Sequence, residues 1–344
     1  MTHLTYLEAA VVGLIQGVSE LFPVSSLGHN VLIPALIGGS WASDLNVSKA
    51  NSPYLAFIVG MHVATAIALL IYFWRDWIRI IGGFFTSLGH WQGWHPRVAT
   101  RDERLAWMII LATIPVGLVG LVADKPFREI FGRPIVAGVF LIINGVILYS
   151  GEKFRPRSSL RADQEIAEQR QEALVSATAR RPPGPPAPGM ARQARHASGQ
   201  QAVRQEELVQ AIQADERLAG MGWMRALIIG TSQILALLAG ISRDGVTMVA
   251  GMNRGLSRED AARFAFLLAT PVILAAGVLE LPKLTGPDGN GIHGQILVGS
   301  VLSGLGAYVS VRFLTRYFQT RSLTPFAIYC VIFGLFSVIY LSVR

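Results

Sequence analysis

Two apolar stretches of this chain, residues 13–29 and 230–246, are diverged copies of one segment, and glycine and serine interrupt both. A constant offset of 217 positions superimposes five identical residues: Gly13 on Gly230, Gln16 on Gln233, Leu21 on Leu238, Ser25 on Ser242 and Gly28 on Gly245. One copy carries a carboxylate, Glu20, and the other a guanidinium, Arg243. Paired, interrupted apolar segments in the two halves of a membrane protein predict a binding site where the repeats meet.

The rest of the chain indicates a membrane environment for these segments. Hydrophobic residues make up 51% of the 344 residues and charged residues only 15%, with a mean hydropathy of +0.44. Water-soluble proteins of this size seldom show that balance. Six runs are long and apolar enough to cross a hydrocarbon core of about 30 Å: residues 54–74, 105–122, 134–150, 260–281, 294–313 and 324–343. We therefore expect an all-α integral membrane protein with six transmembrane helices.

Each interrupted segment is predicted to form a re-entrant helical hairpin, at residues 4–37 and 224–252. Pro23 ends the first arm because proline lacks the amide that a helix needs, and Gly240 to Gly245 supply the second turn. Three spans follow each hairpin, an odd number, so the second half is expected to be inverted relative to the first. The predicted units are residues 1–151 and 223–344, joined by a hydrophilic, disordered connector at 152–222 with room for two exposed helices.

The basic residues predict an orientation and argue against a nucleic-acid partner. Cytoplasmic ends of membrane spans are enriched in arginine and lysine. The richer face is expected to carry Arg75, Arg79, Arg97, Arg101, Arg104, Arg316 and Arg321. Both termini and the mouth of the first hairpin would then lie on the outer side. The net charge of +8 is carried by residues that flank spans rather than by a basic stripe with aromatics, so no nucleic-acid partner is expected. Cys330 is the only cysteine, which excludes a disulfide within the chain.

Polar residues at the two predicted hairpin tips form the candidate site. They comprise Gln16, Glu20, Ser25, Ser26 and His29 on the first tip, and Ser242, Arg243 and Thr247 on the second. Gln16 and Glu20 are four residues apart, so they project from one helix face. The planar fork of Arg243 can hold two phosphate oxygens together, and helix arms that begin after each turn would add backbone N–H groups. A phosphorylated membrane lipid is the expected ligand.

Plain structural interpretations exist for each of these residues. Glu20 and Arg243 could form an ion pair that only neutralises two charges, and Ser25 and Ser26 could be helix caps. His62, alone on an apolar span, suits packing or a supporting position. Ionisable residues at membrane depth are costly and usually functional, so the cluster as a whole favours a functional site.

Two motifs resemble those of a known family. Residues 16–29, QGVSELFPVSSLGH, resemble the (E/Q)xxxE-x-x-PVSS-x-GH signature of the bacterial undecaprenyl pyrophosphate phosphatases of the bacitracin-resistance type, and residues 239–247, AGISRDGVT, are similar to their PGxSRSxxT motif. The resemblance covers nearly the whole chain except 152–222. It implies six spans, two re-entrant hairpins and a divalent cation, Mg²⁺ or Ca²⁺. It also implies hydrolysis of undecaprenyl pyrophosphate to undecaprenyl phosphate and inorganic phosphate, which recycles the lipid carrier for cell-wall synthesis. With the orientation predicted from the basic residues, this site would open to the outer face of the bacterial inner membrane.

The resemblance also implies residue roles. Glu20 would be the essential carboxylate and a metal ligand with Gln16 beside it, Ser26 the nucleophile, and His29 the acid–base group. The pyrophosphate clamp would be Arg243, with substrate contacts from Ser25, Gly28, Gly240, Ser242 and Thr247. At four positions this chain differs from the residue that is frequent in the family. It has Gln16 in place of glutamate, Leu27 in place of threonine, Ala239 in place of proline and Asp244 in place of serine. Gln16 weakens a two-carboxylate metal site, and Asp244 could restrain Arg243, bind metal or lower substrate affinity.

Several alternatives stay open. Ser26 could attack phosphorus to give a phosphoseryl intermediate, or an activated water could attack directly. A transporter or flippase of undecaprenyl phosphate is the competing function, because inverted repeats suit alternating access. The metal-independent acid phosphatases fit poorly, since no histidine follows Arg243 at their motif spacing. Gly13 and Gly17 form a small-xxx-small pair, which is weak support for a homodimer.

Overall fold

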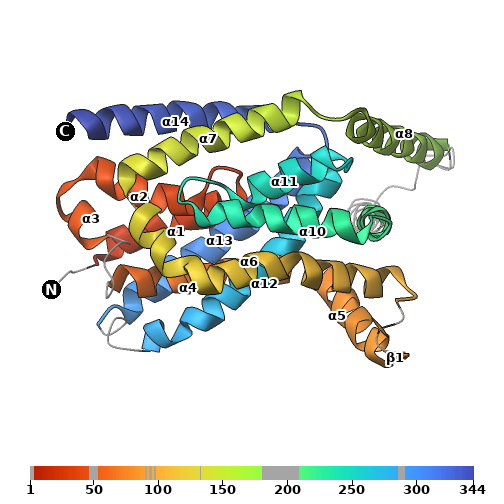
Figure 1. Cartoon of the computed structure of the whole chain (residues 1–344), viewed down its shortest axis with the longest axis horizontal. Helices are drawn as coiled ribbons and strands as arrows, with labels where there is room; N and C mark the ends of the chain where they lie inside the picture. The colour runs from red at the N-terminus through yellow and green to blue at the C-terminus, as the bar shows by residue number, and fades with distance from the viewer. Residues whose placement is uncertain are drawn as a thin grey trace, which may run out of the picture.

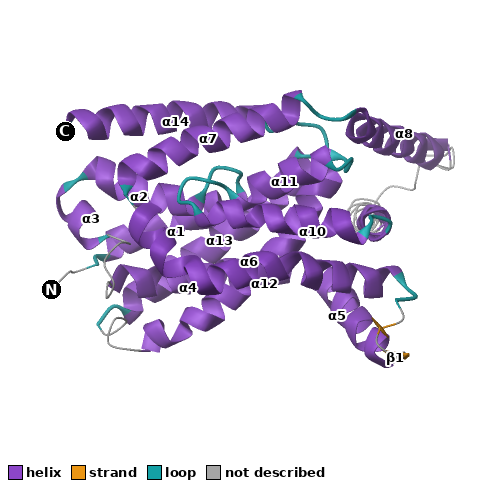
Figure 2. Ribbon diagram, viewed as in Figure 1, coloured by secondary structure: helices purple, strands orange, loops and turns teal. Residues whose placement is uncertain are grey.

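The structure is a computed structural model that describes residues 4–45, 53–89, 91–92, 95–96, 98–131, 133–179, 209–285 and 291–344. Helices dominate these residues, beside one antiparallel pair of two-residue strands, β1 (Trp91–Gln92) and β2 (His95–Pro96) (Figure 2). Five of the described helices are long and apolar enough to cross a membrane, or six if one bent pair counts as a single span. The chain is therefore a multi-pass membrane protein.

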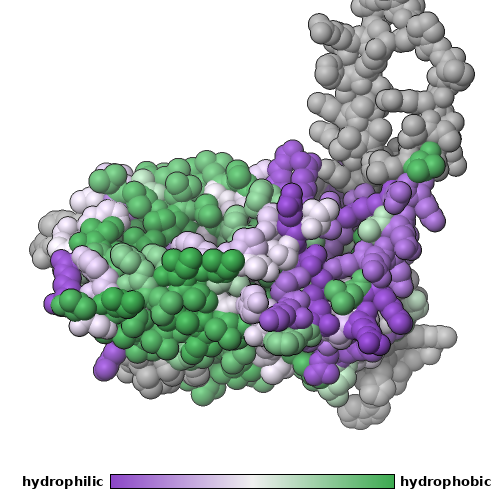
Figure 3. All heavy atoms as spheres, turned by 90° about the horizontal axis from the view of Figure 1, so that it is seen from above, coloured by the Kyte–Doolittle hydropathy of each residue, from purple (hydrophilic) through white to green (hydrophobic). Residues whose placement is uncertain are grey.

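Five of the six predicted spans lie within one helix each, whereas the first, residues 54–74, extends beyond the end of its helix at Tyr72. The six helices are α4 (Pro53–Tyr72), α6 (Arg101–Phe131), α7 (Pro134–Lys153), α12 (Arg258–Thr285), α13 (His293–Tyr317) and α14 (Thr324–Val343). They run roughly along the long axis of the molecule (Figure 1). Apolar side chains cover most of this length, whereas hydrophilic side chains gather at the end that carries α5 (Trp74–Gly89) and α8 (Arg157–Ala179) (Figure 3). Exposed apolar residues such as Ile332, Phe336 and Ile339 of α14 form a surface suited to lipid rather than to water.

Each interrupted segment forms two helical arms around a turn. The first consists of α1 (Tyr6–Leu21) and α2 (Ser26–Ile37), followed by the short α3 (Gly39–Asp44). The second consists of α10 (Trp223–Ser232), the 3₁₀ helix η1 (Gln233–Leu237) and α11 (Arg243–Asn253). The first turn includes Pro23, as predicted. Ser25 and Ser242 cap the second arms by accepting hydrogen bonds from Gly28 N at 3.2 Å and Gly245 N at 3.1 Å, so residues aligned by the sequence offset cap equivalent helices.

Small residues hold the first hairpin against the second half of the chain. Helix α1 packs along α13, and a Cβ added at Gly13 would lie 2.5 Å from the Gly299 carbonyl oxygen. A Cβ at Gly17 would lie 2.1 Å from the Ser303 carbonyl oxygen. The small-xxx-small face that could have supported a homodimer is thus used inside the chain, because close backbone packing leaves it no room for a second copy.

The sequence analysis did not predict α5. This helix follows α4 at a bend of 87°, between the first two predicted spans. It buries Asp76, Ile80, Gly83 and Ser87 and exposes an apolar stripe at helical spacing, made of Trp74, Ile78, Ile81, Phe85 and Leu88. A helix with one polar, packed side and one exposed apolar side is typical of a helix at a membrane surface.

Part of the predicted disordered connector is helical. Helix α8 and residues 209–219 are ordered in the structure, while residues 180–208 lie outside the described residues. Ion pairs dock both pieces on α12. They are Arg170 with Glu259 at 2.6 Å, Arg217 with Asp260 at 2.8 Å and Asp215 with Arg263 at 2.8 Å. Composition did not predict this docking, which the ion pairs supply together with buried apolar residues such as Ile166 and Leu218.

Some of the arginines that were predicted to share one face of the membrane do lie at the same end of the molecule. Arg75 and Arg316 line one hollow of about 700 Å³ at the polar end of the molecule. Arg97, from the same predicted set, lies outside the described residues. The shared end agrees with the predicted arrangement of the spans, and the side of the membrane on which it lies stays a prediction.

Candidate active site

The tips of the two hairpins meet inside the bundle. A Cβ added at Gly28 would lie 2.9 Å from the Gly240 Cα, and Gly240 has a positive φ of 110°, a conformation that glycine adopts without strain. Ser25 Oγ accepts a hydrogen bond from Gly240 N at 3.2 Å as well as its capping bond from Gly28 N. The mirrored contact is present too, since a Cβ at Gly245 would lie 3.3 Å from the Pro23 Cβ. The two glycines aligned by the offset therefore each pack against the opposite tip.

Asn144 of α7 ties both tips together, and the sequence analysis did not identify it. Its Nδ2 donates to the Pro23 carbonyl oxygen at 3.0 Å, and its Oδ1 accepts from Ser242 N at 3.0 Å. The side chain is fully buried. One amide thus satisfies a backbone acceptor of the first tip and a backbone donor of the second. The sequence signal for Asn144 was that it is a single asparagine in an otherwise apolar span. A polar side chain at membrane depth is energetically costly unless it has hydrogen-bond partners.

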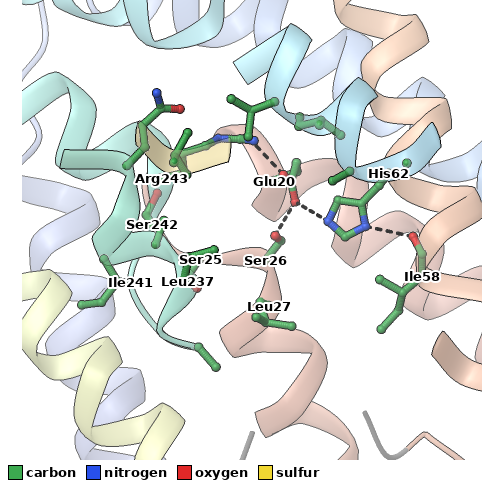
Figure 4. A pocket seen from close by; sticks show the side chains of 18 of the residues that line it. Glu20, Ser25, Ser26, Leu27, Ile58, His62, Leu237, Ile241, Ser242 and Arg243 are labelled. Atoms are coloured by element: carbon green, nitrogen blue, oxygen red, sulfur yellow. Dashed lines mark hydrogen bonds and ion pairs between the residues drawn. The ribbon is translucent and has the colours of Figure 1, made fainter. Parts of the chain in front are cut away.

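Glu20 is the centre of the polar cluster (Figure 4). Arg243 Nη2 lies 3.1 Å from Glu20 Oε1, so the predicted pair is joined across the two hairpins. Ser26 Oγ donates a hydrogen bond to Glu20 Oε2, and Gln16 Nε2 donates to the same oxygen at 2.7 Å. His62 Nε2 lies 3.6 Å from that oxygen. The side chain of Glu20 is 7% exposed and that of Arg243 is 13% exposed, so the cluster is largely shielded from solvent.

A cavity of about 280 Å³ opens beside this cluster. Its polar side chains include Glu20, Ser25, Ser26, His62, Ser242 and Arg243. Its apolar walls come from three long helices, for example Ile58 of α4, Val116 of α6 and Ile273 of α12. A site with an anion-binding polar end and apolar walls suits an amphiphile with a phosphorylated head group.

Five predicted site residues do not line the cavity, namely Gln16, Gly28, His29, Gly240 and Thr247. His29 is 4% exposed and does not line the cavity. Its Nδ1 donates to the Ser25 carbonyl oxygen at 2.7 Å, its Nε2 accepts from the Tyr329 hydroxyl at 2.7 Å, and its ring stacks on Phe333. Thr247 donates to the Arg243 carbonyl oxygen at 2.7 Å. In this geometry His29 and Thr247 support the tips, and their predicted contacts with substrate stay predictions.

Asp244 lies beside Arg243 and not in the cavity. Its Oδ1 is 3.4 Å from Arg243 Nε, and its Oδ2 has no hydrogen-bond partner among the described residues. Of the three effects considered for this residue, the position favours restraint of the Arg243 side chain.

The side chains around Glu20 can hold a divalent cation only if substrate or water supplies further ligands to the ion. Among the described residues, no three His, Cys, Asp or Glu side chains are grouped to hold a metal ion. Glu20 lines the cavity, whereas Gln16 does not. The Gln16 amide oxygen accepts from Asn30 Nδ2 at 2.5 Å, and its nitrogen faces Glu20. Hard cations such as Mg²⁺ are often bound through one or two carboxylates plus phosphate oxygens and water, so Glu20 together with a pyrophosphate fits such an ion.

The fold and the site together define a membrane-embedded phosphate-handling protein with one site built from two hairpins. The chain belongs to the family described as bacitracin resistance protein BacA, whose model matches residues 9–178 and 197–336. An undecaprenyl-diphosphatase of Mycolicibacterium paratuberculosis is 54% identical over 342 residues, with 99% of each chain covered. Undecaprenyl-diphosphatase 2 of Frankia alni is 52% identical, with 97% of each chain covered. Undecaprenyl-diphosphatase 2 of Chromobacterium violaceum is 36% identical, covering 97% of this chain and 98% of that protein.

Proposed function

We propose that this chain hydrolyses undecaprenyl pyrophosphate to undecaprenyl phosphate and inorganic phosphate in a bacterial membrane, which returns the lipid carrier to peptidoglycan synthesis. The observation that carries the proposal is that Glu20, Ser26 and Arg243, from two separate hairpins, line one cavity with apolar walls. Family membership and the hydrolase names of the relatives support it. They give no support to the transporter alternative.

Ser26 is the proposed nucleophile. Its Oγ donates a hydrogen bond to Glu20, which can take the proton as Oγ attacks the terminal phosphorus. The phosphorus–Oγ bond forms as the bond from phosphorus to the bridging oxygen breaks, and undecaprenyl phosphate leaves. Water then hydrolyses the phosphoserine, which releases inorganic phosphate and restores Ser26. Direct attack by a water that Glu20 deprotonates would use the same contacts, so the two routes need an experiment to separate them.

Arg243 is the proposed clamp for the pyrophosphate. Its planar guanidinium matches two phosphate oxygens, and it already lines the cavity. The α2 and α11 N-termini, capped by Ser25 and Ser242, bring backbone N–H groups to the same tips, an arrangement that favours anions. The close contact of Gly28 with Gly240 keeps the two N-termini together.

A divalent cation, Mg²⁺ or Ca²⁺, is proposed to bind at Glu20. A pyrophosphate carries about two to three negative charges near neutral pH, which one arginine does not balance in a shielded site. The bound ion supplies positive charge that offsets the phosphate charge and stabilises the transition state. Glu20 would hold the ion from the cavity wall, and Arg243 would bind the head group from the other hairpin.

We further propose an inverted-topology repeat whose site faces the outer side of the membrane. Helix α1 of the first half packs on α13, and α10 of the second half packs on α6, its counterpart. The aligned glycines repeat this relation, since a Cβ at Gly13 meets the Gly299 carbonyl oxygen and one at Gly230 meets the Ala112 carbonyl oxygen at 2.1 Å. Because three spans follow each hairpin, such a pair of halves is inverted. The arginine-rich end is assigned to the cytoplasm.

The test is phosphate release by the purified protein from undecaprenyl pyrophosphate in detergent with Mg²⁺. We expect Ser26→Ala and Arg243→Ala each to lose at least about 10²-fold in kcat/KM, because each removes a group that contacts the reacting phosphate. Ser19→Ala is the matched control, since among the described residues Ser19 Oγ bonds only to the Ile15 carbonyl oxygen of its own helix, at 2.6 Å. Wild-type protein that moves the lipid monophosphate across vesicles but releases no phosphate would overturn the proposal.

A further inference from the structure

His62, which the sequence analysis set aside as a packing or supporting residue, faces the cavity beside Glu20. It lines the cavity and its side chain is 27% exposed, whereas His29, the imidazole expected to act, is buried behind Ser25. Figure 4 shows Glu20, Ser26 and His62 directed toward one another from α1, α2 and α4. The site therefore contains one accessible imidazole among the described residues that line it, and it belongs to a span rather than to a hairpin.

The hydrogen bonds of His62 determine which nitrogen is available. Nδ1 lies 2.9 Å from the Ile58 carbonyl oxygen, and a carbonyl can only accept, so Nδ1 carries the proton. The lone pair of the neutral ring is then on Nε2, which faces the cavity cluster. A backbone carbonyl that fixes the tautomer through the other nitrogen is the usual arrangement for a metal-binding histidine.

Gln16 orients the two electron-pair donors from behind. Its Nε2 lies 2.7 Å from Glu20 Oε2 and 3.4 Å from His62 Nε2, and Gln16 itself is fully buried and outside the cavity lining. Its amide can thus donate one hydrogen toward each acceptor. The neutral His62 ring has a single lone pair, on Nε2, so an ion bound there displaces the longer 3.4 Å contact with Gln16, whereas Gln16 keeps its 2.7 Å bond to Glu20.

The spacing of the two donor atoms suits a shared ion. Glu20 Oε2 and His62 Nε2 are 3.6 Å apart. Two atoms each about 2.1 Å from one tetrahedral ion lie about 3.4 Å apart.

We infer that Glu20 and His62 together form a mixed carboxylate–imidazole metal site, in which His62 takes the ligand position that Gln16 does not fill. The inference rests on the proposed cation-dependent phosphatase function and specifies which residues of this chain hold the ion. Because an imidazole nitrogen suits Zn²⁺ better than Ca²⁺, the site prefers Zn²⁺ to Ca²⁺. Gln16 is a positioning residue in this arrangement.

Mn²⁺ is the probe for the test, because its electron spin detects bound nitrogen directly. The full chain, purified without a polyhistidine tag, is titrated with Mn²⁺, and binding is followed by loss of the free-ion electron paramagnetic resonance signal. Electron spin-echo envelope modulation then reports ¹⁴N bound to the ion. We expect ¹⁴N modulation in the wild type and none in His62→Gln, with Mn²⁺ affinity weakened at least about tenfold, since even loss of a supporting residue typically costs that much.

His293→Gln, at the exposed start of α13 and outside the cavity lining, is the matched control and should keep both the modulation and the affinity. Labelling the wild-type protein with ¹⁵N-histidine should convert the ¹⁴N pattern to a ¹⁵N pattern, which tests the inference even if His62→Gln fails to fold. Mn²⁺ that binds in a Glu20-dependent manner without nitrogen modulation, modulation that survives in folded His62→Gln, or absence of any Glu20-dependent Mn²⁺ binding would each overturn the inference. Failure of the proposed function is read separately, as no phosphate release by the wild type.

Discussion

Replacing Asn144 by leucine tests whether the hairpin tips depend on one side chain of α7. Leucine is similar in size but cannot bond to the Pro23 carbonyl oxygen or to Ser242 N, both now 3.0 Å from the amide. A buried polar group left without its partner costs about 1–3 kcal/mol, so Asn144→Leu should destabilise the joined tips by about 2–6 kcal/mol. Since a misplacement of about 1 Å can cost about 10²-fold in rate, kcat/KM for phosphate release should fall about 10²-fold.

Ser337→Ala is the control for this variant. Ser337 is also fully buried, on the α14 helix that packs along α7, but it donates only to the Phe333 carbonyl oxygen of its own helix at 2.7 Å. Both variants are assayed for steady-state phosphate release and for thermal unfolding in the same detergent. If Asn144→Leu kept activity within about twofold of Ser337→Ala, the tips would not need the Asn144 bridge, and the reasoning would be refuted.

Three further substitutions test individual contacts by the same assay. Gly28→Ala would put a Cβ 2.9 Å from the Gly240 Cα and should lower kcat/KM about 10²-fold. Its control is Gly117→Ala, whose Cβ would meet open space and should leave kcat/KM unchanged. Equal activities of the two variants would contradict close packing of the hairpin tips. Asp244→Ser removes the carboxylate 3.4 Å from Arg243 Nε and should lower KM about two- to fivefold, so an unchanged or higher KM would argue against restraint. Arg243→Lys keeps the charge but loses the planar fork, and its kcat/KM should drop at least about tenfold; wild-type activity would exclude bidentate binding.

The sequence predicted the helices of the spans and hairpins and the identity of the paired charges because those features are local. Hydropathy over about 20 residues identifies a span, and Pro23 and Gly240 mark turns through their own backbone constraints. Glu20 and Arg243 were informative because ionisable residues are rare at membrane depth. The structure joins these two residues at 3.1 Å.

What the sequence did not supply depends on how helices rotate and pack. Whether His29 or His62 faces the cavity is decided by the contacts of α2 with α14 and of α4 with α12 and α13, which no local pattern records. Asn144 acts on backbone groups from two distant segments, so only the assembled fold identifies it. Helix α5 was missed because its apolar stripe alternates with polar residues and gives a weaker hydropathy signal than a span.

The central claim is that the two hairpin tips enclose one pyrophosphate site, and cross-linking tests it most directly. Cys330 is the only cysteine, so Cys330→Ala gives a cysteine-free background. Leu27 and Leu237, from different hairpins, both line the cavity, whereas Leu235 is 47% exposed and does not. A short thiol cross-linker should join Leu27→Cys to Leu237→Cys within one chain, inorganic pyrophosphate should slow the reaction, and Leu27→Cys with Leu235→Cys should not react. No cross-link at the first pair, or equal reaction at both pairs, would contradict a single site between the tips.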